Sequence, residues 1–180
     1  SAYLQPPEKI ETLSPNIALL FCQTRSSFGD TARRDFYRGL REAWLRKLSS
    51  KELYLFEYHL QNRPGSATEG VPVYFPRLIA EDLRSLKGVS RGDTIDAYRP
   101  SDPSTLPYHA QAVMHLNWYV ISRLWWDAEQ DLDALLDEYY RLFYGPAQKE
   151  MQAFIEHAEA NWTKMTSQVE PIDASLALLA

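Results

Sequence analysis

Apolar residues recur at helical spacing through the second half of the chain, from residue 109 to residue 168. The stripe of the first predicted helix, residues 109–126, consists of Val113, Leu116, Val120 and Leu124. A second helix is predicted from Asp131, a suitable N-cap, to the stop signal at Gly145, with an apolar stripe that ends at Leu142 and Phe143. A third amphipathic helix is predicted over residues 146–168. This half of the chain therefore indicates packed helices.

Short apolar runs alternate with amphipathic helices in the first half of the chain. The runs predicted as strands are Ile17–Cys22, Lys51–Leu60 and Val89–Tyr98. The helices predicted between them are Thr31–Leu48, which Asp30 can cap, and Pro76–Leu86. Alternation of this kind predicts an α/β fold with a parallel sheet.

Three parallel strands cannot close a barrel, so the small sheet needs cover on both faces or further strands. The chain begins Ser-Ala-Tyr-Leu without an initiator Met, and we expect an N-terminal part of the same protein to supply those strands. The predicted organisation is a strand-and-helix segment over residues 1–106, a helical extension over 107–168 and a tail over 169–180. The tail is expected either to fray or to dock through Leu176, Leu178 and Leu179.

Composition and charge exclude several functional classes. The net charge is −5 and no Lys/Arg cluster occurs, which argues against a nucleic acid partner. No apolar run approaches the roughly 18 residues of a membrane span. The single cysteine, Cys22, excludes an intrachain disulfide and a multi-cysteine metal site. His109 and His115 do not share a helical face, and no phosphate loop or dinucleotide fingerprint occurs, so we expect no cofactor.

Several segments resemble a known family. They read SAYLQPP, SPNIALLF, AWLRKLSSKELYLFEYHL, PRLIAEDLRSLKGVSRG and LNWYVISRLWWDAEQDLDALLDEYYRLFYGPA. Across most of residues 2–160 the chain resembles DUF4838, a bacterial domain family found in proteins related to TIM-barrel glycoside hydrolases, including alpha-glucuronidase-like ones. The resemblance implies the C-terminal portion of a (β/α)8-like barrel followed by a helical extension. It also implies a carbohydrate partner and a periplasmic or extracellular location.

Active sites of such barrels lie at the C-terminal ends of the strands. Glycoside hydrolysis needs two carboxyl groups, about 5–5.5 Å apart for retention and about 6.5–9.5 Å apart for inversion. Adjacent strand ends predict Glu57 and Asp93 as this pair, with Glu57 as the general acid because burial would favour its neutral form. The alternatives are a Glu57 paired with a nearby Arg and a Gly-Asp turn at Asp93.

Three further residues are expected to surround the sugar: Tyr58, His59 and Arg25. Arg25 would clamp the carboxylate of a uronic acid bidentately. The plainer alternatives are a surface ion pair for Arg25 and a hydrogen bond to a loop carbonyl for His59.

Three hypotheses about function follow. The first is a fragment of a glycoside hydrolase relative acting on a polysaccharide or a uronic-acid-containing glycan, inactive in isolation because catalysis would require the missing strands. The second is a non-catalytic carbohydrate-binding or accessory domain. The third is a helical interaction module.

Overall fold

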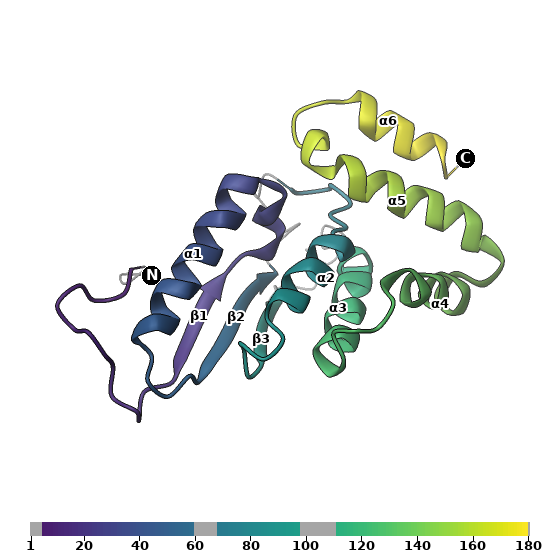
Figure 1. Cartoon of the computed structure of the whole chain (residues 1–180). Helices are drawn as coiled ribbons and strands as arrows, with labels where there is room; N and C mark the ends of the chain where they lie inside the picture. The colour runs from purple at the N-terminus through teal and green to yellow at the C-terminus, as the bar shows by residue number, and fades with distance from the viewer. Residues whose placement is uncertain (1–4, 60–67, 98–110, 180) are drawn as a thin grey trace, which may run out of the picture. The chain divides into compact units, whose positions relative to one another are not determined.

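The computed structural model describes residues 5–59, 68–97 and 111–179 (Figure 1). These residues belong to two compact units. One contains residues 1–59 and 85–97, and the other contains residues 60–84 and 98–180. The loop predicted over 99–107, most of that over 61–71, and His109 lie outside the described residues. The predicted division between residues 106 and 107 also falls there and stays a prediction.

A three-stranded parallel sheet forms the centre of the first unit. Its strands are β1 (Leu19–Gln23), β2 (Leu53–His59) and β3 (Asp93–Ala97), in the spatial order β1-β2-β3. The α/β class and the parallel sheet are confirmed, and each strand is shorter than its apolar run. Consecutive parallel neighbours are compatible with a barrel segment, and the (β/α)8 barrel stays a prediction.

Helix α1 (Thr31–Lys47) covers one face of this sheet. As predicted, Asp30 caps the helix, since its side chain accepts hydrogen bonds from the backbone N–H groups of Ala32 and Arg33. The Arg41 guanidinium of α1 donates to the Gln23 side chain at 2.8 Å. The α1-facing residues alternate along β1 with residues of the opposite face, such as Leu20, which is 52% exposed. The sheet therefore has a covered face, toward α1, and an open face.

The second unit contains the other predicted helices. They are α2 (Pro76–Ser85), α3 (Gln111–Trp126), α4 (Leu132–Tyr144) and α5 (Gln148–Met165), with a short 3-10 turn, η3 (Gly145–Ala147), before α5. Most of the predicted stripes are buried, including Leu116, Val120 and Leu124 of α3. The expectation was wrong at the end of α4, where Leu142 and Phe143 are 67% and 52% exposed.

One buried polar residue, Asn117, connects α3 to the segment that precedes α2. Its side-chain nitrogen donates to the Val73 carbonyl at 2.9 Å, and its side-chain oxygen accepts from the Phe75 N–H at 3.2 Å. The side chain therefore satisfies two backbone groups that would otherwise be buried without partners. The apolar pattern of α3 did not predict this role for Asn117.

The tail forms a helix, α6 (Glu170–Ala177), that packs beside α5. The expected docking through Leu176, Leu178 and Leu179 is only partial, because these side chains remain 59%, 37% and 51% exposed. The buried residue of α6 is Ser175. The Pro171 carbonyl lies 3.2 Å from Nε2 of His157 on α5. The short helix is thus held by polar contacts as well as by packing.

Substituting Asp131 tests the capping of α4. Its side chain accepts from the backbone N–H groups of Asp133 and Ala134 at 2.9 and 3.3 Å. We expect Asp131→Ala to lower the free energy of unfolding by about 1 kcal/mol, because an N-terminal donor loses its acceptor. Urea denaturation followed by circular dichroism measures the change. The control is Asp137→Ala, in the exposed middle of α4, and an equal loss in both variants would contradict the capping role.

Candidate functional site

Polar side chains gather in the first unit where β1 and β2 end. β1 ends at Gln23 and continues into the 3-10 turn η1 (Arg25–Gly29), while β2 ends at His59. Because side chains alternate along a strand, Glu57 and His59 lie on the same face of β2. Gln23 is the register partner of Glu57, so this is the covered face, toward α1.

Arg25 brings the two predicted carboxylates together. Its guanidinium lies 3.6 Å from Oε2 of Glu57 and 3.5 Å from Oδ2 of Asp93. The backbone N–H of Arg25 also donates to Oε1 of Glu57. Since one guanidinium contacts both groups, the two carboxyls lie less than about 10 Å apart, compatible with the glycosidase range. We refer to Arg25, Glu57 and Asp93 as the buried ionic cluster.

The position of Asp93 within its strand differs from that of Glu57. Asp93 is the first residue of β3 and the register partner of Leu55, so it reaches Arg25 from the start of its strand. Glu57 lies near the carboxyl end of β2. The strand predicted over Val89–Tyr98 therefore begins at Asp93, two residues before the level of Glu57.

The side chains of the buried ionic cluster are shielded from solvent. The side chains of Arg25 and Glu57 are 0% exposed, and that of Asp93 is 2% exposed. The plainer alternative for Glu57, an ion pair with a nearby arginine, is therefore present in the structure. The surface ion pair considered for Arg25 is not, because this side chain is buried.

Burial sets the protonation of Glu57. It raises the pKa of this carboxyl to about 7, against the opposing influence of the Arg25 charge and of hydrogen bonds from Arg25 and the Gln23 side chain. The nearby Asp93 charge raises the pKa further. Near neutral pH the carboxyl is therefore divided between its charged and neutral forms, as a general acid requires.

His59 and Tyr58 lie on opposite faces. His59 is buried on the covered face, and desolvation, with a contribution from the Arg25 charge, lowers its pKa to about 3. Its imidazole is therefore neutral at physiological pH. Tyr58 belongs to the open face, so it does not join His59 and Arg25 around one ligand position.

Two further side chains complete the network around Glu57, and of these Arg41 was not predicted from the sequence. Gln23 is 1% exposed and hydrogen-bonds to the Glu57 carboxyl, while Arg41 is 5% exposed and donates to Gln23 at 2.8 Å. A signal existed for Arg41, because it lies four residues after Tyr37 and therefore on the sheet-facing side of α1. Gln23 follows the apolar run of β1, and its side chain lies on the covered face, where it contacts Arg41 of α1.

A second group of side chains lies at the carboxyl end of the open face. Tyr58 and Asp96 are register partners on β2 and β3. The ring of Phe56 lies 5.0 Å from that of Tyr58, centroid to centroid. The adjacent Cys22 raises the pKa of the Tyr58 phenol, and Asp96 adds to this effect. We call Cys22, Phe56, Tyr58 and Asp96 the open-face cluster.

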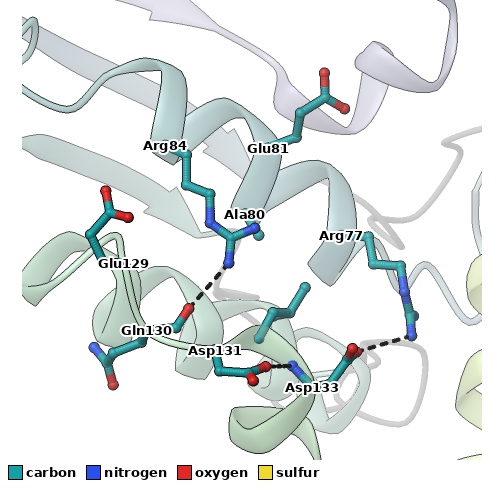
Figure 2. A pocket seen from close by; sticks show the side chains of 9 residues that line it. Arg77, Ala80, Glu81, Arg84, Glu129, Gln130, Asp131 and Asp133 are labelled. Carbon is teal, nitrogen blue, oxygen red and sulfur yellow. Dashed lines mark hydrogen bonds and ion pairs between the residues drawn. The ribbon is translucent and has the colours of Figure 1, made fainter.

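The second unit contains a surface groove of about 680 Å³ between α2 and the α3–α4 connection (Figure 2). Its basic side chains already have partners. Arg84 donates to the backbone carbonyls of Ala128 and Gln130 at 3.3 and 3.1 Å. Arg77 lies 3.7 Å from Asp133. These contacts tie α2 to the start of α4, so the groove is a structural junction.

The structure yields no metal centre in the part of the chain that it describes, since no three His, Cys, Asp or Glu side chains form a group that could hold an ion. Over the same residues, none of the helices combines the length and apolar character needed to cross a membrane.

Comparison with known proteins gives one match. A family model described as a domain of unknown function, DUF4838, matches residues 1–156. No curated protein and no solved structure matches the chain. The match spans the sheet, the buried ionic cluster and most of the helical unit. The chain therefore belongs to the DUF4838 family.

Proposed function

We propose that this chain is part of a carbohydrate-active protein related to TIM-barrel glycoside hydrolases, with its glycan site at the carboxyl ends of β1, β2 and β3. The observation that carries the proposal is the gathering of Arg25, Glu57 and Asp93 where β1 and β2 end in a parallel sheet. Ligand sites of parallel α/β sheets occur at this end. In the intact protein, further strands would complete the site.

In the hydrolytic form of the proposal, Glu57 is the general acid and Asp93 the second carboxylate. The separation of the two groups supports this assignment. The pKa of Glu57, about 7, supports it too, because an acid catalyst must be protonated near the working pH and still release its proton.

A non-catalytic glycan-binding domain is the second candidate. The exposed fractions of the buried ionic cluster, 0%, 0% and 2%, favour it, since a catalytic carboxyl must reach its substrate. The position of Glu57 on the α1-facing side favours it as well. In this form, the cluster positions the strand ends and no covalent chemistry occurs.

Turnover of a Glu57→Gln variant separates the two forms. If Glu57 is the general acid, the substitution in the intact protein lowers kcat for glycoside hydrolysis at least about 100-fold, because the amide cannot protonate the leaving group. The assay is release of reducing ends from a panel of polysaccharides and aryl glycosides, including glucuronides. The isolated 180-residue chain is expected to be inactive.

The matched control is Glu52→Gln, the same substitution at the exposed start of the sheet, where Glu52 pairs with Arg91. It should leave turnover unchanged. Wild-type turnover in Glu57→Gln would remove Glu57 from the mechanism. Hydrolysis by the isolated chain would contradict the dependence on further strands.

A further inference from the structure

We propose that the open-face cluster contacts an uncharged or amino sugar, and that Asp96, rather than Arg25, selects the sugar. This inference rests on the proposed carbohydrate function and names the ligand chemistry of the same end of the sheet. It is independent of whether Glu57 catalyses hydrolysis.

The two faces of the sheet differ in what they leave accessible. Glu57 and Asp93 are register partners of residues whose side chains face α1, and both are buried. The alternate positions form the open face. They are Leu20, Cys22, Tyr54, Phe56, Tyr58, Thr94 and Asp96. Tyr54 is 38% exposed and Leu20 is 52% exposed, while the four residues of the open-face cluster are half-buried, so part of each of these side chains remains accessible.

The charge of the open face restricts the ligand. Of the strand residues described on this face, Asp96 carries a charge and the others are uncharged. A uronate or phosphate brought here would meet a carboxylate without a compensating cation. Arg25, the expected uronate clamp, lies 3.6 and 3.5 Å from Glu57 and Asp93 and is 0% exposed. Releasing it for a ligand would leave two buried carboxylates without their cation, which is costly.

The remaining chemistry suits a sugar without negative charge. The rings of Phe56 and Tyr58, with centroids 5.0 Å apart and planes at 60°, offer apolar surface to the C–H face of a pyranose. Asp96 accepts hydrogen bonds from sugar hydroxyls or from an ammonium group, and the Tyr58 hydroxyl adds a donor. A few oriented polar groups beside an aromatic surface are typical of small-ligand sites.

Binding to the 180-residue chain tests the inference with four probes: cellotetraose, chitotetraose, glucosamine tetramer and tetragalacturonate. Ligand-detected saturation-transfer NMR and titration give the affinities. We expect at least one of the first three to bind at least 10-fold more tightly than tetragalacturonate. Asp96→Asn should weaken that binding at least 5-fold, while Glu52→Gln leaves it unchanged.

Cys22 provides a reporter that requires no substitution. It is the sole cysteine of the chain and belongs to the open-face cluster. A saturating probe should slow its alkylation by iodoacetamide at least 3-fold. Protection that grows with protein concentration in the absence of sugar would mean that a second copy covers this face, and would overturn the inference.

The other outcomes separate this inference from the proposed function. If a probe binds but Asp96→Asn binds equally well and Cys22 is not protected, the open-face assignment is wrong and the carbohydrate function stands. Preferred binding of tetragalacturonate would likewise overturn the selection of an uncharged or amino sugar and leave the carbohydrate function standing. If none of the four probes binds the 180-residue chain, the open-face inference fails, whereas the proposed function is decided by glycoside turnover of the intact protein.

Discussion

Replacing Arg25 with methionine is expected to lower the free energy of unfolding by about 3–5 kcal/mol, because removing one partner leaves buried charges uncompensated. The Arg25 guanidinium contacts both Glu57 and Asp93, and all three side chains are at most 2% exposed. Methionine fills much of the same space, so the loss reports the charge more than a cavity. Urea denaturation at pH 8, where the Glu57 carboxyl carries its charge, measures the effect.

Arg91→Met is the matched control. Arg91 pairs with Glu52 at 3.4 Å, but its side chain is 60% exposed, so solvent screens the interaction. We expect a loss below about 1 kcal/mol for this variant. A loss of similar size in Arg25→Met would mean that the buried ionic cluster is not a significant part of the stability of the first unit.

The second large effect is a dependence of stability on pH that originates at Glu57. Its pKa is about 7 in the folded chain and 4.5 in its ordinary state. The folded state therefore retains a proton that the unfolded state releases, and the stabilisation is complete below pH 4.5 and is lost as the pH rises through 7. A shift of this size corresponds to about 3 kcal/mol.

His59 makes the free energy of unfolding depend on pH in the opposite direction. Its pKa is about 3 in the folded chain and 6.5 ordinarily, so its contribution is present above pH 6.5 and is lost as the pH falls toward 3. Between pH 4.5 and 6.5 the two slopes oppose each other. The wild-type profile alone therefore conceals the contribution of Glu57, and a difference between variants is required.

Glu57→Gln removes the titrating carboxyl and leaves His59 in place. We expect the free energy of unfolding of this variant, relative to wild type, to increase by about 3 kcal/mol between pH 4.5 and pH 8. Urea midpoints at pH 4.5, 6, 7 and 8 give the difference, and Glu52→Gln should show a nearly constant one. Parallel pH profiles for Glu57→Gln and wild type would contradict a raised pKa for Glu57.

The local elements of the fold were predictable because their signals are local. Asp30 and Asp131 cap α1 and α4 as expected, since a capping side chain bonds to the backbone two or three residues away. The alternation of apolar runs and helices likewise predicted the parallel sheet. Phe143 was expected in the buried stripe of α4 but is 52% exposed. Helical periodicity identifies the apolar face of a helix, but it does not show how far along the helix neighbouring segments cover that face.

The candidate site was predictable in place but not in arrangement. The rule that strand ends carry function led to Glu57, Asp93 and Arg25, and the structure brings these residues together, although Asp93 begins its strand. Their mutual pairing depends on the register between β2 and β3 and on the turn that follows β1, which involve residues far apart in sequence. For the same reason, the role of Arg41 was missed.

The amino-acid sequence by itself determined the strand and helix order, the helix caps and the membership of the DUF4838 family. The period-2 pattern of β2 also separated Glu57 and His59 from Tyr58. Only the tertiary structure decided which of these two faces α1 covers, and hence that Arg25 is buried between two carboxylates while Asp96 belongs to the open face. The physical reason is that alternation assigns residues to two faces, whereas long-range packing selects the face that becomes buried.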